Sequence, residues 1–267
     1  MLQSHSLMPL LTSPQRLKKA ARACMRPGSS PGSDGITWFD YRKNLGDRLE
    51  KLASALIDKT WRPKPFKLHR METITGKRFL ITIPTVEDRI VHRAMRSCIE
   101  PILEQQAFAE FVFAYRPGRG RLAAVRQGMN YLRENRSWVA DADVADASGG
   151  AKLDDVMDWL SVWISDGVFL SLVREALKGL PSPLAPGSGL WPLLFNLRLL
   201  PADRMLQDLA VVRFADNYCV FTNSYHEAQN AFDLIEETLH TCGLHISPEK
   251  SGIKRNVNPE DLFLIAG

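Results

Sequence analysis

Two acidic segments of the chain carry the residues best suited to chemistry on a phosphate. The first, 138–144, has an apolar strand pattern interrupted by Asp141 and Asp143. The second, 211–221, places Asp216 between two short apolar runs, as at the tip of a β-hairpin. Carboxylates that meet from two strands can hold two divalent cations, so the pattern predicts a phosphoryl-transfer site. Asp141 shares a strand face with Asp143 and either assists it or contacts solvent.

The segments around these acids alternate between helical and strand patterns. Apolar residues recur at helical spacing over 38–59, 87–105, 122–135, 154–164, 168–178, 192–209 and 226–242. Residues 13–25 predict a further, basic helix capped by Ser13. A β-ribbon is expected over 66–83, and short strands over 244–246 and 262–265. Helices combined with hairpins in this order predict an α+β fold, an antiparallel sheet backed by helices.

Composition and charge fit a globular chain with an anionic partner. The 267 residues carry a net charge of +4, and 45% are hydrophobic, enough for one large domain or two close subdomains. Basic residues gather around Lys18 and Lys19, over 62–67, and around Arg116 and Arg119. Because several clusters accompany an acidic centre, we expect a track for nucleic acid; a solvated basic surface is the alternative.

Other classes of protein are disfavoured by the sequence. The four cysteines are scattered and form no Cys-x-x-Cys pair, which argues against a disulfide framework or a zinc site. No apolar stretch approaches the roughly 18 residues that cross a bilayer. The apolar residues near the N-terminus are too few and too interrupted for a signal peptide. We therefore expect a cytoplasmic protein with no membrane partner.

A series of short motifs, all in one order, resembles reverse transcriptases encoded by bacterial group II introns and their relatives. The likeness extends from residue 28 to residue 267. Phe-Ala-Asp-Asn at 214–217 stands where that family has Tyr-Ala-Asp-Asp, and Pro-Glu-Lys-Ser at 248–251 stands for its Pro-Glu-Lys-Thr. The other matching segments are 30–35, 76–89, 113–119 and 192–197. Each motif alone is weak, and their common order carries the resemblance.

This resemblance implies the fingers and palm of a polymerase right hand. A basic helical extension is then expected over 1–27, fingers over 28–135 and a palm over 136–267. The last residues resemble the start of the family's primer-grip segment, so no thumb is expected in this chain. The partners that the family implies are an RNA template, a primer and deoxyribonucleotides, with a separate protein as one source of a thumb.

The resemblance also implies roles for individual residues. Asp143 and Asp216 would hold Mg²⁺, or Mn²⁺ in its place, with Asn217 beside them. Lys250 would protonate the leaving pyrophosphate. The pocket for the incoming nucleotide would be lined by Lys77, Arg78, Arg89, Ser148 and Gly187. Nucleic acid would be held by Lys18, Lys19, Arg116 and Arg119.

Several departures from the family pattern fall on this pocket. Asn217 replaces the second hairpin aspartate; its amide can coordinate a cation but brings no negative charge, so metal affinity should fall. Some viral RNA polymerases resemble this Asp-Asn form and remain active. Ser148 replaces an aromatic residue that excludes a 2′ hydroxyl, and the adjoining Gly149 and Gly150 loosen the backbone. Pro186 stands where the family has a glutamine.

Two functions therefore stay open. The first is an RNA-directed DNA polymerase that is weakened or relaxed in its choice of sugar. The alternative is a catalytically degenerate module, derived from a reverse transcriptase, that binds RNA or another protein. A truncated gene product without a present function is a third reading. Metal-dependent primer extension separates the first from the others, and salt-dependent RNA binding distinguishes the second.

Overall fold

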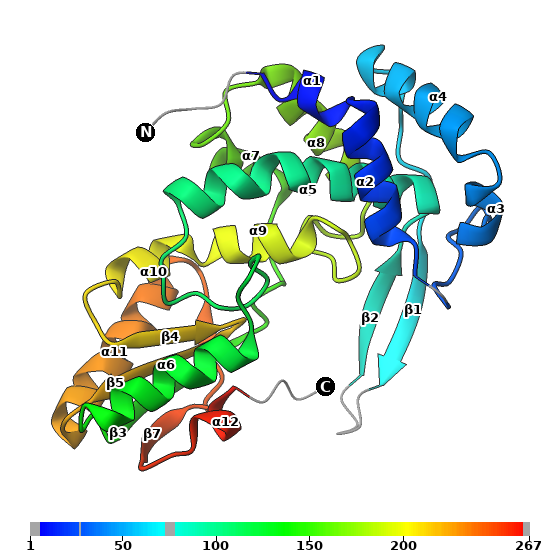
Figure 1. Cartoon of the computed structure of the whole chain (residues 1–267). Coiled ribbons are helices and arrows are strands. Elements are labelled where there is room, and N and C mark those ends of the chain that lie inside the picture. The colour runs from blue at the N-terminus through cyan, green and yellow to red at the C-terminus, as the bar shows by residue number, and fades with distance from the viewer. Residues whose placement is uncertain (1–5, 27, 73–77, 264–267) are drawn as a thin grey trace. The chain divides into compact units, whose positions relative to one another are not determined.

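The computed structural model describes residues 6–26, 28–72 and 78–263 (Figure 1). The chain folds into two compact units, and each is assembled from two separate stretches. One unit comprises Met1–Gln106 and Ser148–Leu194, and the other comprises Ala107–Ala147 and Phe195–Gly267. The expected extension, fingers and palm are functional divisions, and their boundaries stay a prediction.

The first unit is mainly helical. Its helices are α1 (Met8–Leu11), α2 (Pro14–Cys24), α3 (Trp38–Arg42), α4 (Leu45–Ile57), α5 (Val86–Gln106), α7 (Leu153–Ser161) and α8 (Gly167–Lys178). The predicted cap is present, because the Ser13 side chain accepts a hydrogen bond from the amide of Arg16. Helix α2 packs against α4 and α5, and it buries Leu17, Ala20 and Ala21 there.

A two-stranded ribbon completes this unit. Strand β1 (Lys67–Glu72) pairs antiparallel with β2 (Arg78–Ile83), as predicted from the sequence. A loop from later in the chain lies against β2, where the amide of Thr82 donates a hydrogen bond to the carbonyl of Pro186 at 2.8 Å. Helix α9 (Trp191–Arg198) follows this loop and continues into the second unit.

The second unit is built on an antiparallel sheet. Its strands are β3 (Trp138–Ala145), β4 (Val211–Phe214), β5 (Asn217–Thr222), β6 (His245–Ile246) and β7 (Gly252–Arg255). They run in the order β4-β5-β3-β6, and β7 also pairs with β3. The helices of this unit are α6 (Arg121–Arg133), α10 (Leu200–Met205), α11 (Tyr225–Thr241) and α12 (Pro259–Leu262).

Helices cover both faces of this sheet. Helix α11 packs on β3 and β5, and α6 lies across β4 and β5 on the opposite face (Figure 1). Val139 of β3 and Phe221 of β5 belong to a buried cluster with Ala124 and Val125 of α6. Because side chains alternate along a strand, Asp143 is directed to the same face as Val139. The α6 face of the sheet therefore carries the acidic residues at one end.

The predicted α+β class is confirmed, whereas several element predictions are wrong in detail. The helix expected over 38–59 is broken between Arg42 and Leu45, and the helix over 192–209 is divided into α9 and α10. Leu262, expected in a strand, ends α12, because the Asn258 side chain caps that helix. Residues 264–265 of that expected strand lie outside the described residues. Strand β7 and helix α1 were not predicted.

Candidate active site

The hairpin tip is a two-residue turn between β4 and β5. Phe214 pairs with Asn217, which leaves Ala215 and Asp216 at the turn. Ala215 has a φ of 56°, a left-handed conformation that costs a non-glycine residue on the order of 1 kcal/mol. Its carbonyl accepts a hydrogen bond from Nη1 of Arg213 at 2.9 Å. The strained turn is thus held in place by a side chain of its own hairpin.

The register of the sheet brings Asp143 next to this tip. Asp143 of β3 is the cross-strand partner of Asn217, the residue after Asp216. The amide of Val144 also donates to the backbone carbonyl of Asp216 at 2.9 Å. Both aspartates are half-buried. Two acids from neighbouring β-elements therefore occupy adjacent positions at one end of the sheet.

A turn after β6 folds over Asp143. The Lys250 ammonium lies 3.1 Å from Oδ1 of Asp143, and the amide of Ser247 donates to the Asp143 carbonyl at 2.7 Å. The Ser251 hydroxyl accepts a hydrogen bond from the Asp143 amide at 3.0 Å. More than half of the Lys250 side chain is exposed, so this ion pair contributes little stability. The lysine is accordingly free to exchange one anionic partner for another.

The side chain of Asn217 is engaged at both ends. Its Nδ2 donates to the carbonyl of Leu262 at 3.0 Å, and its Oδ1 lies 3.4 Å from the Cys219 thiol. A cation held by Asn217 would use the same oxygen in place of the thiol. The amide therefore braces the hairpin against α12, a role that the family resemblance did not suggest.

Asp141 is buried and does not contact solvent, so that reading of the sequence is wrong. Its carboxylate pairs with Lys254 of β7. The Cys219 thiol lies 3.5 Å from it, so the single S–H donates either to Asp141 or to Asn217. Burial, followed by the charge of Asp141, raises the pKa of Cys219 well above its ordinary value. Asp141 thus contacts side chains of both neighbouring strands, Cys219 on β5 and Lys254 on β7.

The nucleotide pocket was expected to be lined by five residues, and those that the structure describes all lie in the first unit. Lys77 is outside the described residues, and Arg78 is described only through its backbone in β2. The Arg89 guanidinium donates to the carbonyls of Pro84 and Ser30, and burial lowers its pKa. The Ser148 hydroxyl accepts a hydrogen bond from Nε1 of Trp191 at 3.0 Å. Their nucleotide contacts stay predictions.

Gly187 occupies a position that only glycine fits. Its φ is 96°, and a Cβ atom there would lie 2.0 Å from the Thr82 carbonyl oxygen. The adjacent Pro186 carbonyl accepts the amide of Thr82. Close approach of the loop to β2 therefore depends on the missing side chain.

The residues expected to hold nucleic acid differ in exposure. Lys18 and Lys19 are exposed on α2. Arg116 is buried, and its Nη1 donates to the carbonyls of Ala109 and Val112. Arg119 pairs with the exposed carboxylate of Glu110. Burial of Arg116 argues against a direct contact with nucleic acid. For Lys18, Lys19 and Arg119, contact with nucleic acid stays a prediction.

Two features beside the hairpin were missed from the sequence. The fully buried Arg213 forms a two-pronged ion pair with Asp203, each N–O distance being 2.8 Å. The signal was present, because an arginine within an apolar strand must find a buried acid. Tyr115 has a φ of 63°, and burial together with the charge of Asp216 raises its pKa to about 12. No spacing pattern marks such a residue.

The donor set at the sheet end suits a hard divalent cation, although it is small. Carboxylate oxygens are the ligands that Mg²⁺ prefers, and Asp143 and Asp216 offer two such groups. Within the part of the chain that the structure describes, no three His, Cys, Asp or Glu side chains gather in a way that could hold a metal ion. None of the described helices is long and apolar enough to cross a membrane.

Comparison with known proteins identifies the family. Residues 63–259 match the family described as "Reverse transcriptase (RNA-dependent DNA polymerase)". The chain is 28% identical over 227 residues to "Protein YkfC" of Escherichia coli, covering 78% of this chain and 58% of that protein. It is 24% identical over 177 residues to "Uncharacterized 91 kDa protein in cob intron" of Schizosaccharomyces pombe, covering 61% of this chain and 21% of that protein.

The family match covers well over half of the chain. The protein therefore belongs to the reverse transcriptase family, as its mixed helical and antiparallel β fold also indicates. The chain spans little more than half of the Escherichia coli relative and about a fifth of the Schizosaccharomyces pombe relative.

Proposed function

We propose that the chain is an RNA-directed DNA polymerase domain of the group II intron type. The observation that carries this function is the register of β3 and β5, which places Asp143 across from Asn217 and beside Asp216. The Schizosaccharomyces pombe relative is named as a protein in an intron, which supports an intron-borne origin. The substrates would be an RNA template, a primer and deoxyribonucleotides.

Asp143 and Asp216 are the residues that would hold the metal, through their carboxylate oxygens. When bound, Mg²⁺ or Mn²⁺ would acidify the primer 3′ hydroxyl and neutralise charge on the leaving pyrophosphate. Asn217 would add an uncharged ligand, so that metal binding would be weaker than with a second aspartate. The ion pair between the buried Asp141 and the exposed Lys254 would hold the strand that carries Asp143 in position.

The basic residues would act on the phosphates. Lys250, now 3.1 Å from Asp143, would transfer a proton to pyrophosphate as it leaves. Lys77, Arg78 and Arg89 would hold the triphosphate through charge-assisted hydrogen bonds. Lys18, Lys19 and Arg119 would contact the phosphates of the template or primer, which makes binding salt-dependent.

Primer extension on an RNA template tests this function. The full chain with Mg²⁺ or Mn²⁺ should extend a primer, and Asp143→Ala and Asp216→Ala should each abolish the extension. Asp158→Ala removes an exposed carboxylate of α7 and is the matched control that should keep full activity. Wild-type extension no greater than that of Asp216→Ala would contradict the proposal.

A second candidate function is an RNA-binding module without polymerisation. It is favoured by the side chain of Asn217, whose two polar atoms already serve the fold. RNA binding should then survive in Asp216→Ala and should weaken steeply with salt, because phosphate contacts release counterions. Filter binding across a salt series measures this. Undetectable RNA binding, or affinity that does not change with salt, would contradict this second function.

A further inference from the structure

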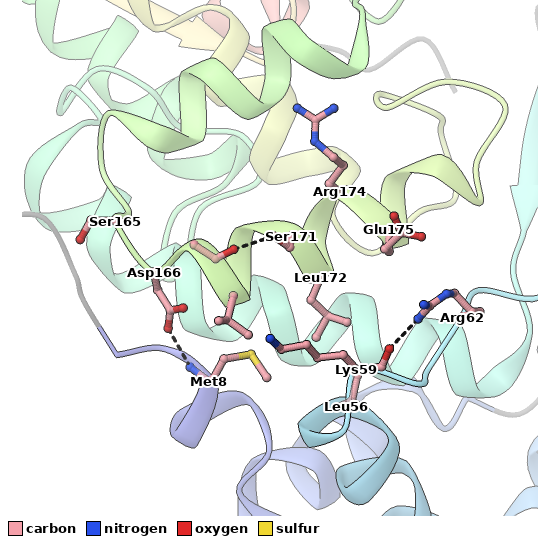
Figure 2. Close-up of a pocket in the computed structure, with 12 residues that line it drawn as sticks. Met8, Leu56, Lys59, Arg62, Ser165, Asp166, Ser171, Leu172, Arg174 and Glu175 are labelled. Carbon is pink, nitrogen blue, oxygen red and sulfur yellow. Dashed lines mark hydrogen bonds between the residues drawn. The ribbon is translucent and has the colours of Figure 1, made fainter.

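A cavity of about 760 Å³ lies in the first unit, among residues to which the polymerase function gives no role (Figure 2). Three stretches of chain enclose it. Helix α1 contributes Met8, and the end of α4 with the turn after it contributes Leu56, Lys59 and Arg62. The third stretch, within 165–175, is the start of α8 and the two residues before it. The volume falls within the roughly 300–1,000 Å³ that is typical of small-molecule sites.

The floor of this cavity is apolar. Leu56 and Leu172 are buried beneath it, and Val168 at its edge remains 40% exposed. Figure 2 shows the Met8 thioether and the Leu172 side chain directed toward the same space. A ligand that covers this floor would remove apolar surface from water, which is favourable.

The first acid in the wall, Asp166, is fully used by the fold. One carboxylate oxygen accepts from the amides of Leu7 and Met8 at 2.7 and 3.2 Å. The other accepts from the amide of Phe169 at 2.9 Å and so caps α8. Burial alone would raise the pKa of Asp166, but these backbone hydrogen bonds outweigh it and lower the pKa. Asp166 therefore ties α1 to α8, and backbone amides occupy both of its carboxylate oxygens.

The remaining charged residues of α8 form ion pairs within α8 or with α7. The Lys178 ammonium lies 2.7 Å from Glu175, and this hydrogen bond lowers the pKa of the glutamate. Arg174 lies 2.6 Å from Asp154. The charge of Arg62 also lowers the pKa of Glu175, but the hydrogen bond from Lys178 has the larger effect.

Two cations from the opposite wall remain for a ligand. Arg62 directs Nη1 to the carbonyls of Lys59 and Trp61, both at 2.7 Å. This leaves its other nitrogens available, since guanidinium carries five N–H donors. Within the described chain, the Lys59 ammonium pairs with no carboxylate. Figure 2 shows the Lys59 side chain stretched across the floor between Met8 and Leu172.

The backbone of Lys59 supports a role for its side chain. The residue follows the C-cap of α4 and has a φ of 57°. Glycine, and less often asparagine, usually occupies this left-handed position after a helix, because a Cβ atom there lies close to the following carbonyl oxygen. The hydrogen bond from Arg62 to the Lys59 carbonyl holds that conformation. The strained turn thus fixes both cations on the same edge of the cavity.

We propose that this cavity binds a small organic anion with an apolar body. Lys59 and Arg62 hold the acid group, and Met8, Leu56 and Leu172 contact the body. The lysine stem adds apolar surface beside its charge, as lysines at such edges commonly do. The site is independent of the polymerase function, because none of these residues belongs to the proposed catalytic or nucleotide-binding set.

Two fluorescent probes that share one apolar body test the proposal on the full chain. Anilinonaphthalene sulfonate carries the acid group, and N-phenylnaphthylamine lacks it. The sulfonate should bind more tightly and should shift the Met8 methyl resonance in a methyl-labelled sample. Lys59→Glu should weaken sulfonate binding about tenfold or more, because charge-assisted contacts are lost. The affinity for the neutral probe should change little.

The matched control is Lys51→Glu, which reverses an exposed charge on α4 away from the cavity lining and should not alter either affinity. Met8→Ser removes apolar contact and should weaken both probes. Each variant is first shown to unfold in one cooperative thermal transition. Probe binding is then measured below that transition, where the protein is folded. An unmoved Met8 methyl at saturating sulfonate, equal wild-type affinities for the two probes, or equal effects of Lys51→Glu and Lys59→Glu would overturn the proposal.

Discussion

The Asn217 side chain donates a hydrogen bond to the backbone carbonyl of Leu262, 3.0 Å away. Leu262 ends α12, which packs against α6, so the bond joins the hairpin tip to the layer that covers one face of the sheet. An aspartate at position 217 has no N–H to donate, and its carboxylate would face a carbonyl oxygen. The same substitution that restores a metal-binding carboxylate therefore removes a structural contact.

Asn217→Asp should consequently lower stability and raise metal affinity together. Without metal, we expect the free energy of unfolding to fall by about 1–3 kcal/mol, the range for losing a partly buried hydrogen-bond partner. Added Mn²⁺ should recover part of that loss, because a cation that binds the folded state stabilises it. Urea denaturation in EDTA and in Mn²⁺ measures both effects.

Asn230→Asp is the control for this substitution, since Asn230 is exposed on α11. It should leave stability within about 0.5 kcal/mol, as is usual for surface changes. Equal stability of Asn217→Asp and wild type in EDTA would show that the Leu262 hydrogen bond contributes nothing.

The sheet and its hairpin were predictable, because period-two apolar runs directly encode a strand buried on one face. Strand β7 was missed because Gly252–Arg255 has only one apolar residue, Ile253, and depends on pairing with β3. The end of the chain shows two local signals in conflict. The apolar run from Leu262 favours a strand, whereas Asn258 followed by Pro259 favours the start of a helix. In α12 the cap decides the outcome.

The candidate site could be predicted from the sequence only in part, for a related reason. Asp143 lies on β3 and Asp216 in the turn between β4 and β5, and the pairing of these strands follows from their sequence patterns. The partner of Arg213 lies on α10, so nothing near it in sequence identifies Asp203. Asn217 was interpreted from family resemblance as a weakened ligand, and its contact with Leu262 depends on the tertiary placement of α12.

The buried pair of Arg213 and Asp203 predicts a large loss of stability on truncation. Arg213→Met would leave the Asp203 carboxylate buried without its cation and would release the Ala215 carbonyl at the hairpin tip. We expect a loss of about 3–5 kcal/mol in the free energy of unfolding, the range for breaking a buried ion pair on one side. Chemical denaturation measures this.

The double variant Arg213→Met with Asp203→Leu should recover much of that loss, because neither charge then remains buried. Arg174→Met removes one partner of an exposed pair with Asp154, and it should cost less than about 1 kcal/mol. Similar losses for Arg213→Met and Arg174→Met would mean that the buried pair contributes no more than a surface contact.

Gly187→Ala should disturb the loop that lies against β2. The added Cβ atom would meet the Thr82 carbonyl oxygen at 2.0 Å, and the φ of 96° is unfavourable for alanine. We expect stability to fall by at least about 1 kcal/mol through backbone strain. Gly46→Ala is the control: it lies in α4 with open space around its Cβ position, and it should stabilise by up to about 1 kcal/mol. Thermal melting that gives both variants the same shift would rule out this account of Gly187.

Ser148 predicts weak discrimination between sugars if the chain polymerises nucleotides. Its small side chain accepts a hydrogen bond from Trp191 and offers little bulk to exclude a 2′ hydroxyl. Wild type should incorporate ribonucleotides nearly as well as deoxyribonucleotides, and Ser148→Phe should restore a preference for deoxyribonucleotides. Ser54→Phe, at an exposed position of α4, should not. Strong preference for deoxyribonucleotides in wild type would contradict this role.

Asp88 and His92, one turn apart on α5, should give stability two opposing pH dependences. Burial raises the pKa of Asp88 to about 6, above the unfolded value of 3.8. The folded state thus retains a proton that the unfolded state releases, and stability falls as pH rises through that interval. Burial lowers the pKa of His92 to about 4 from 6.5, so that stability instead rises with pH between those values.

Each substitution should expose the contribution of the other residue. Asp88→Asn should make the free energy of unfolding rise as pH increases from about 4 to 6.5, by on the order of 3 kcal/mol. His92→Gln should make it fall over the same interval, because only the Asp88 contribution remains. Asp58→Asn and His69→Gln change exposed residues and should follow wild type. Urea denaturation at several pH values measures these slopes, and parallel profiles for wild type, Asp88→Asn and His92→Gln would show that neither group titrates differently on folding.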